Sequence, residues 1–466
     1  MSRGEQIKAP RGTFDVLAEH AGVRASLRES ARKLLEGAGY ERIETPVLEA
    51  TELFARGVGA STDIVQKEMF TLQDGGGRSL TLRPEGTAPI CRAYVEHGMH
   101  KRKQPVKLWY LSSFFRHERA QAGRYRQFWQ VGAEALGSDD PAVDAESIVL
   151  LAALLEELGV RGVRLRLASL GSGESRGAYR ELLQAHLRAH EESLSAEVRG
   201  RIELNPLRAF DSDHDATRRV MASAPRLLDH LDDSDSEHFA QVRALLDIAE
   251  VPYEVDPTLV RGLDYYTRTV FEFTSDALGA QSGVGGGGRY DGLVEKIKGS
   301  STDGPTTPGI GWAAGIERIL LASEATPAAG SPLDLFVALG VGGEGGVRGR
   351  GGEGGEGGVS GRGGEDGEGG VRGRGGEDGE GGDGGEVRKA GFGVLGAARS
   401  AGLTAQMELA GRSLKGQLGL ANALGARYVA IVEGERTVLK DMQGGGQETL
   451  ATDTVVHAVL RALRDL

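Results

Sequence analysis

The spacing of hydrophobic residues predicts a chain that mixes helices with short strands. Apolar side chains recur three or four positions apart across residues 17 to 39, which is typical of a helix with one buried face. Residues 139 to 159 predict a second helix, mostly buried, and residues 163 to 172 predict a strand. Helical spacing dominates again between residues 173 and 250. The first part of the chain therefore contains both element types and a helix-rich segment.

Other stretches predict strands and turns. Residues 40 to 54 alternate like a strand interrupted at Pro46, a residue that commonly marks a sheet edge. Residues 80 to 97 predict a strand that continues into a helix through a polar turn, and this turn could serve simply as a helix cap. Residues 283 to 294 predict a glycine-rich turn before a helix, where the backbone can approach a ligand closely. Its spacing differs from that of a P-loop.

The last part of the chain alternates strand and helix. Residues 333 to 466 begin with a strand, continue with a helix from about 388 to 401, and end with a final helix. This order is typical of a small α/β domain with a mixed sheet. The composition of residues 323 to 332 predicts a linker before it.

A glycine-rich tract interrupts this domain at about residues 342 to 386. Its repeats have a period of twelve, and it offers only three valines for burial. Such a segment cannot offset the entropy lost on ordering, so we expect a disordered loop, expanded in tandem at a tolerant turn. Its RGR groups could touch RNA, but eleven acidic residues against five basic ones argue against tight binding.

The net negative charge of the chain does not exclude a protein that binds nucleic acid. The net charge is −12, but the tract alone contributes five minus eleven, or −6. The remainder is only mildly acidic, so basic strips such as residues 101 to 107 can meet phosphates. A chain of 466 residues with 39% hydrophobic content fits two or three globular domains.

Metal, disulfide and membrane chemistry find little support in the sequence. The single cysteine, Cys91, excludes an intrachain disulfide and a multi-cysteine zinc site, and we expect it to be buried. His230 and His238 lie in an acidic run typical of a solvated face, so we expect surface residues rather than ligands. No apolar run reaches about 18 residues, which favours a cytoplasmic protein without a membrane anchor.

The richest candidate chemistry lies in residues 114 to 134, which predict two strands meeting near Gly123. Four arginines crowd this hairpin, and a guanidinium fork matches phosphate, so a bound polyphosphate is indicated. The same residues could instead form a solvated face with weak ion pairs. Gln130 and Glu134, four apart and beside aromatic residues, share one strand face and suggest a pocket wall.

These residues carry a specific resemblance. The FRHER strand, the GRYRQF loop and the Q-x-x-x-E spacing resemble motif 2 of class II aminoacyl-tRNA synthetases. Their detailed sequence resembles that of the histidyl-tRNA synthetase family. Residues 40 to 54 resemble motif 1, which pairs two subunits, and residues 308 to 320 resemble motif 3. The segment RGLDYYTRTVFE, residues 261 to 272, resembles a signature of the histidyl family; without it, the tyrosine pair would suggest core packing. RSLKGQ, residues 412 to 417, resembles a turn of the family's anticodon-binding domain.

The resemblance implies a fold and its boundaries. Residues 1–322 are expected to form an α+β catalytic domain, in which helices flank an antiparallel sheet, with a helix-rich insertion at about 173–250 that leans on the tRNA acceptor arm. Residues 323–332 would be the linker. Residues 333–466 would form the α/β anticodon-binding domain, interrupted at about 342–386. A homodimer is expected.

The resemblance also implies an activity: ATP-dependent activation of L-histidine to histidyl-adenylate and transfer to the 3′ end of tRNA(His), with Mg²⁺ bound alongside ATP and no separate metal site. Arg261 and Arg116 would be catalytic, and Glu134 and Tyr266 would bracket the imidazole. The implied histidine-binding residues are Glu85, Gly86, Thr87, Arg116, Gln130, Glu134, Arg261, Tyr265 and Tyr266. The implied ATP-binding residues are Arg116, Glu118, Arg124, Phe128, which would stack on adenine, and Arg318. Gln121 and Arg126 would contact the tRNA acceptor end.

Some positions depart from the family pattern, and other functions compete. Ala120 replaces a usual proline, Trp129 replaces a common histidine, and the segment between RYVAIVE and TVLKDM is short, which bears on tRNA contacts. The main alternative is an inactive paralogue, the histidine-sensing regulatory subunit of ATP phosphoribosyltransferase, which typically lacks the RGLDYY signature and the C-terminal domain. A further alternative is an RNA-binding module that uses the RGR tract.

Overall fold

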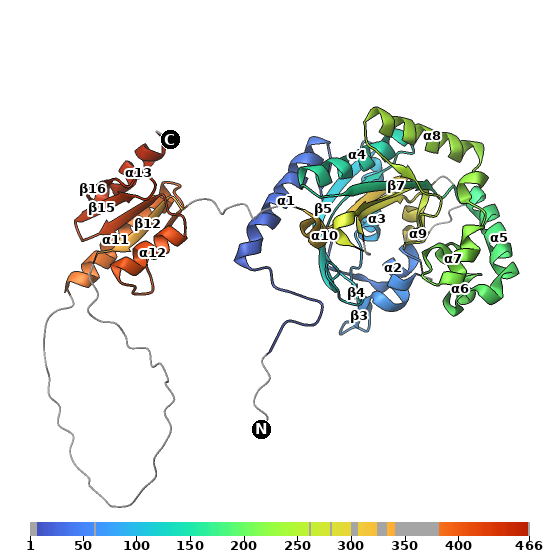
Figure 1. Cartoon of the computed structure of the whole chain (residues 1–466), viewed down its shortest axis with the longest axis horizontal. Helices are drawn as coiled ribbons and strands as arrows, with labels where there is room; N and C mark the ends of the chain where they lie inside the picture. The colour runs from blue at the N-terminus through green and yellow to red at the C-terminus, as the bar shows by residue number, and fades with distance from the viewer. Residues whose placement is uncertain are drawn as a thin grey trace, which may run out of the picture. The chain divides into compact units, whose positions relative to one another are not determined.

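The computed structural model describes residues 7–59, 62–260, 262–279, 282–299, 306–323, 333–340 and 382–464. The chain divides into two compact units, Met1–Ala328 and Ala329–Leu466. Both are shown in Figure 1. Arg261, most of the expected linker and the repeat tract as far as residue 381 lie outside the described residues.

An eight-stranded sheet organises the larger unit. Its order is β1-β5-β6-β11-β10-β9-β7-β8; neighbours from β5 to β7 pair antiparallel, and the two edge strands join in parallel. The strands are β1 Glu41–Arg42, β5 Val106–Phe115, β6 Gln127–Leu136, β7 Val163–Ser169, β8 Glu254–Val255, β9 Thr267–Ser275, β10 Gly283–Arg289 and β11 Gly309–Gly315. The expected antiparallel α+β sheet is thereby confirmed.

Helices cover both faces of this sheet (Figure 1). One face packs on α1 Ala18–Gly37, α4 Pro141–Glu157, α8 Asp233–Ile248 and α10 Ile316–Ala322. The other side of the unit holds α3 Thr87–Glu96, α5 Gly173–Ala189, α6 Ala196–Arg201, α7 Asp215–Ala222 and α9 Leu293–Lys298, with the 3-10 turns η2 Met99–Lys101, η3 Glu191–Ser193, η4 Pro206–Asp211 and η5 Leu227–His230. The 3-10 turn η6 Asp276–Leu278 lies on the first side, where Leu278 packs against the same core as α10.

The alternation within β6 decides which side chains face the site. Val131, Ala133 and Ala135 are buried against the α1 and α4 side. Because successive strand residues point to opposite faces, Gln130 and Glu134 point the other way. Their expected shared face is therefore confirmed.

The segment predicted as one strand around Pro46 is divided. A three-stranded sheet, β2-β4-β3, contains β2 Leu48–Ala50, β3 Phe70–Gln73 and β4 Ser79–Leu82. The strand prediction is wrong after residue 50, because α2 Thr51–Gly57 follows, with Leu53, Phe54 and Gly57 buried at helical spacing. The π-helix η1 Ile64–Glu68 then leads to β3.

The predicted glycine-rich turn is also wrong in its first part. Residues 283 to 289 form the central strand β10, paired with β9 and β11. Glycine is required sterically, because a Cβ at Gly287 would overlap the backbone carbonyl of Gly311 on the neighbouring strand. Two backbones therefore approach closely, and the strand presents almost no side chains.

His238 does not lie on a solvated surface, which corrects the expectation for this residue, although most of the acidic run around it is exposed. His238 is buried, and its Nε2 lies 2.9 Å from the Asp144 carboxylate. Asp144 also accepts a bond from the Arg289 Nε at 3.1 Å, and all three side chains are buried. His230, in contrast, is exposed as expected.

The smaller unit contains a five-stranded mixed sheet, β13-β12-β14-β15-β16, parallel across β13, β12 and β14. Its elements are β12 Leu335–Leu339, α11 Gly382–Ser400, β13 Ala405–Met407, α12 Leu414–Ala423, β14 Tyr428–Val432, β15 Arg436–Asp441, β16 Gln447–Ala451, the turn η7 Thr452–Thr454 and α13 Val455–Arg464. Helix α11 begins inside the tract predicted to be disordered, and β16 was not predicted. The short segment before β15 is a tight turn, in which the Glu433 amide donates to the Arg436 carbonyl at 2.9 Å.

Candidate active site

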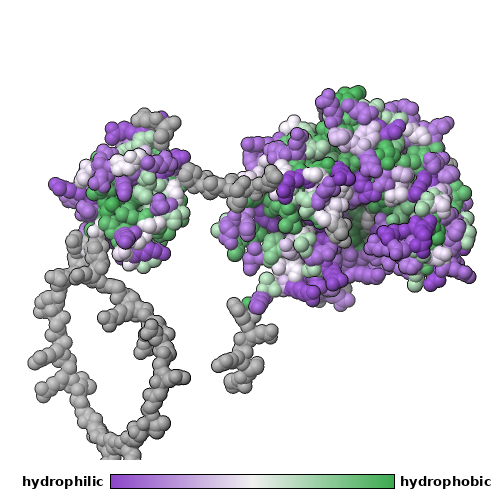
Figure 2. Space-filling model, in the orientation of Figure 1, coloured by the Kyte–Doolittle hydropathy of each residue, from purple (hydrophilic) through white to green (hydrophobic). Residues whose placement is uncertain are grey.

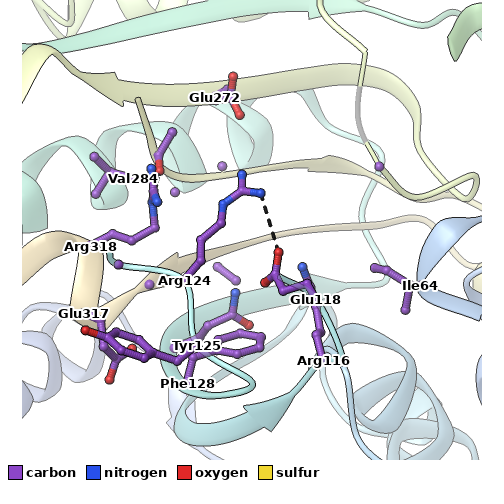
Figure 3. A pocket seen from close by; sticks show the side chains of 18 of the residues that line it. Ile64, Arg116, Glu118, Arg124, Tyr125, Phe128, Glu272, Val284, Glu317 and Arg318 are labelled. Carbon is purple, nitrogen blue, oxygen red and sulfur yellow. Dashed lines mark hydrogen bonds and ion pairs between the residues drawn. The ribbon is translucent and has the colours of Figure 1, made fainter. Parts of the chain in front are cut away.

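A cavity of about 600 Å³ lies on the face of the large sheet toward which Gln130 points. Six residues expected to bind substrates line it, namely Arg116, Glu118, Arg124, Phe128, Gln130 and Arg318. They come from the loop between β5 and β6, from β6 itself and from α10, so the structure brings together residues that are far apart in the sequence. Figure 3 shows Arg124 extending across the cavity toward Glu118, with Arg318 beside it.

Arg116 is held in a fixed place at the start of the loop. Its Nε donates to the Pro84 carbonyl at 2.9 Å, and its guanidinium lies 5.3 Å from the centre of the Phe128 ring. This bond uses one edge of the guanidinium. An arginine anchored through its Nε is well placed to present its terminal nitrogens to an anion.

Arg124 and Arg318 bring two more positive charges to the cavity. Arg124 forms an ion pair of 3.5 Å with Glu118, and the Arg318 Nε donates to the Gly283 carbonyl. Burial, followed by the positive charge of Arg124, lowers the pKa of Arg318. The two cations therefore repel one another, and an anion between them would relieve that repulsion.

The floor of the cavity is the backbone of β10. Gly283, Val284, Gly285 and Gly286 line it, with Ala313 and Gly315 from neighbouring β11. Such a floor is flat and presents mainly peptide groups. A planar ring can approach it closely.

A cluster of buried polar groups centres on Glu134. Its carboxylate accepts bonds from the Thr87 hydroxyl at 2.8 Å and from the Tyr290 hydroxyl at 2.6 Å. Burial raises the pKa of Glu134 to about 8, although these two hydroxyl donors act in the opposite direction. A strongly shifted buried carboxyl next to a cavity is typical of a binding site.

Glu85 lies beside this cluster and is anchored by backbone. It accepts bonds from the amides of Thr87 and Ala88, both at 2.9 Å, and from the Tyr265 hydroxyl at 3.4 Å. Burial raises its pKa as well. Gly86 between them is required sterically, because a Cβ there would lie 2.6 Å from the Tyr110 ring.

The remaining predicted residues lie in different surroundings. Tyr266 is buried, with its ring 4.8 Å from that of Tyr265. Gln121 is exposed on the loop, and the Arg126 amide donates to the Gly12 carbonyl at 2.7 Å. Arg261 falls outside the described residues. The Trp129 ring packs into the core on the opposite face of the sheet, so its departure from the family pattern does not reach the cavity.

Sequence reasoning missed several residues of the site. Tyr290 directly follows the glycine strand, but was assigned no role. Glu272, on the alternating strand β9, lines the cavity, and its strand phase could have indicated this. The Glu317 carboxylate accepts hydrogen bonds from the Arg24 guanidinium at 2.7 Å and from the Trp129 backbone amide at 3.0 Å. These two bonds anchor the start of α10.

The site and sheet define a class of protein. An antiparallel sheet that carries three motifs in order, with arginines above a glycine strand, is the catalytic domain of a class II aminoacyl-tRNA synthetase. A family model described as histidyl-tRNA synthetase matches residues 12–319. The chain belongs to the histidyl-tRNA synthetase family.

Individual relatives agree with this family. A histidine–tRNA ligase of Halorhodospira halophila is 52% identical over 326 residues, covering 70% of this chain and 76% of the relative. One of Nocardia farcinica is 43% identical and covers 99% of both chains. The crystal structure of apo histidyl-tRNA synthetase of S. aureus has a TM-score of 0.72 at 31% identity, covering 97% of this chain and all of the other.

Proposed function

We propose that this protein is a histidine–tRNA ligase, which activates L-histidine with ATP and transfers it to the 3′ end of tRNA(His). The observation that carries the proposal is the buried carboxyl of Glu134, with hydroxyl groups around it, next to an arginine-lined cavity. The nearly full-length relatives that carry this name support it. They give no support to the alternative of a regulatory subunit.

Recognition of the imidazole is proposed for Glu134, with Tyr266 on the other ring nitrogen. The pKa of about 8 keeps Glu134 largely protonated at neutral pH. An imidazole N–H that donates to the carboxylate favours the ionised form, so histidine would be bound with loss of that proton. An apolar amino acid would leave the buried group without this partner and would be rejected.

The amino and carboxyl groups of histidine would be held at the cavity side of this cluster. Glu85, with Thr87 and Gln130, is proposed to receive the ammonium group. The anchored Arg116 would bridge the substrate carboxylate and the α-phosphate, and so align the attack of the carboxylate on phosphorus. Arg261 is proposed, from the signature alone, to stabilise charge on the α-phosphate.

ATP would occupy the cavity above β10. Arg124 and Arg318 are proposed to neutralise its terminal phosphates, and Phe128 to stack on adenine. Carboxylates fit a nucleotide-bound Mg²⁺, which commonly takes one or two of them along with phosphate oxygens, and Glu118 and Glu272 line this cavity. When bound, the ion supplies positive charge to the phosphates.

The tRNA and subunit partners are also proposals. Exposed Gln121 and the neighbouring Arg126 would meet the acceptor end. A homodimer is supported by exposed apolar residues on the small sheet and the strand segment before it, where Val47 is 40%, Leu48 42% and Leu72 42% exposed. Apolar side chains exposed on and beside one small sheet favour association with a second copy.

The test is ATP–pyrophosphate exchange with each amino acid, followed by charging of tRNA(His). We expect exchange with histidine alone, greatly reduced by Arg261→Ala and by Arg116→Ala. Histidine binding without any exchange would overturn the proposal and favour the sensor alternative.

A further inference from the structure

The helix-rich segment between residues 173 and 250 reaches back to the histidine site at three points. The Arg208 Nη2 donates to the Gly262 carbonyl at 3.0 Å, the Asn205 amide donates to Asp264 at 2.8 Å, and the Arg176 Nη1 donates to the Tyr266 carbonyl at 2.6 Å. The bonds reach every second residue of one stretch, residues 262–266, which we call the signature segment.

The signature segment is irregular, because β9 begins only at Thr267. On its other side the Asp264 amide donates to the Val58 carbonyl at 3.3 Å, and Tyr265 donates to Glu85 at 3.4 Å. The helix-rich segment therefore supplies three of these anchors, and it does so through side chains. Such anchors can set where Tyr265 and Tyr266 lie.

Arg208 both lines the cavity and bonds to the signature segment. Its side chain is only 17% exposed, it lines the cavity, and its Nη1 is fixed by Asp211 at 3.0 Å. Nearby Arg201 forms an ion pair of 2.8 Å with Asp63, which also lines the cavity. Both edges of the site are thus tied to residues 201–208.

We propose that Arg176, Asn205 and Arg208 are positioning residues for histidine recognition: they hold the signature segment so that its tyrosines face the buried carboxyl cluster. The inference rests on the proposed function. None of the three needs to contact the substrate. Their effect passes through the backbone carbonyls of Gly262 and Tyr266 and the side chain of Asp264.

The test is histidine-dependent exchange by full-length Arg176→Ala, Asn205→Ala and Arg208→Ala, with kcat corrected by active-site titration. A displacement of about 1 Å can cost up to about 100-fold, so we expect the histidine KM to rise about 10- to 100-fold while the ATP KM changes little. Arg208→Lys, which keeps a donor and the charge, should recover part of the loss.

Arg188→Ala is the matched control. Arg188 lies in the same helix-rich segment, but it pairs with Glu203 inside that segment at 2.6 Å. We expect its histidine KM to match that of the unaltered protein. If the three residues had only a structural role, the variants would have a lower melting temperature and a smaller active fraction, but the same histidine KM. An unchanged histidine KM in the three variants would therefore overturn the inference.

A double-mutant cycle sharpens the result. If Asn205 acts through Asp264, the effects of Asn205→Ala and Asp264→Ala on the histidine KM should not add. Additive effects would contradict this contact as the route. Should the unaltered protein show no exchange, the proposed function fails, and the inference is then judged by whether the same variants weaken histidine binding measured by calorimetry.

Discussion

At the residue scale, burial sets the chemistry of the two best-defined carboxyl groups in opposite directions. Among the described residues, Glu134 has hydroxyl donors but no cation in contact with it, and its pKa rises to about 8. Asp144 is also desolvated by burial, but His238 and Arg289 outweigh that effect, and its pKa is lowered. One of these carboxyl groups is therefore suited to exchange a proton with a ligand, and the other is ionised at neutral pH.

Glu134→Gln tests the first of these. The folded protein holds the Glu134 proton between pH 4.5 and about 8, whereas the unfolded chain releases it near 4.5, so this group's stabilisation falls as pH rises through that window. Glutamine removes the effect. As the pH rises through this window, we expect the free energy of unfolding of the variant to increase relative to that of the unaltered protein by up to about 1.4 kcal/mol per pH unit. We also expect the variant to lose histidine-dependent exchange.

Thermal unfolding between pH 5 and 8 measures the difference. Exposed Glu41→Gln serves as the control and should show no such trend. A difference in melting temperature that is the same at every pH would contradict the shifted pKa.

At the element scale, strands and helices were predictable where side-chain types recur with a clear period, and less so elsewhere. The alternation of β6 gave the shared face of Gln130 and Glu134 from spacing. The glycine run of β10 offered no alternation to read, so a turn was predicted where a central strand lies. His238 was misplaced because an acidic run suggests solvent, while its partners Asp144 and Arg289 lie far away in sequence.

Asp144→Ala tests the contact that joins α4, α8 and β10. Removing the carboxylate leaves the fully buried guanidinium of Arg289 without its main partner. Breaking a buried pair this way costs about 3–5 kcal/mol, so we expect a large fall in the free energy of unfolding, measured by denaturant titration. Exposed Asp215→Ala, which affects only a surface pair with Arg218, should change little; equal effects would refute the importance of burial.

Gly311→Ala tests the close packing of β11 on the site. A Cβ at this position would overlap the carboxylate of Glu134. Overpacking costs about 1–3 kcal/mol, and displacement of Glu134 should also raise the histidine KM. In contrast, the Cβ added by Gly177→Ala within α5 meets open space, so this variant should be more stable by up to about 1 kcal/mol. Unfolding and exchange assays on both variants distinguish overpacking at Gly311 from the open position at Gly177.

At the scale of the whole molecule, every described residue of the cavity belongs to the larger unit. That unit's visible surface is mostly hydrophilic with scattered hydrophobic patches (Figure 2). No helix among the described residues is long and apolar enough to cross a membrane. The order of the motifs could be predicted from sequence, since each motif is local. The contacts of residues 201–208 with the signature segment could not, because they join stretches that are distant in sequence.

Deleting residues 343 to 380 tests the repeat tract. The deletion removes a connection between β12 and α11 in the smaller unit and leaves every described residue of the cavity in place. We expect histidine-dependent exchange and tRNA(His) charging to be unchanged. A loss of all tRNA affinity would instead support the RNA-binding alternative for the RGR groups.

The strand β10 has a consequence for inhibitor selectivity. A pocket wall made of side chains can adapt to a bulkier compound by changing rotamers, but a wall of peptide groups packed against a neighbouring strand has no rotamers to change. A nucleotide analogue with a substituent on the face toward β10 should therefore be excluded outright. Chemical diversity in compounds aimed at this pocket belongs on the side away from β10, where the partly exposed side chain of Arg124 can change its conformation.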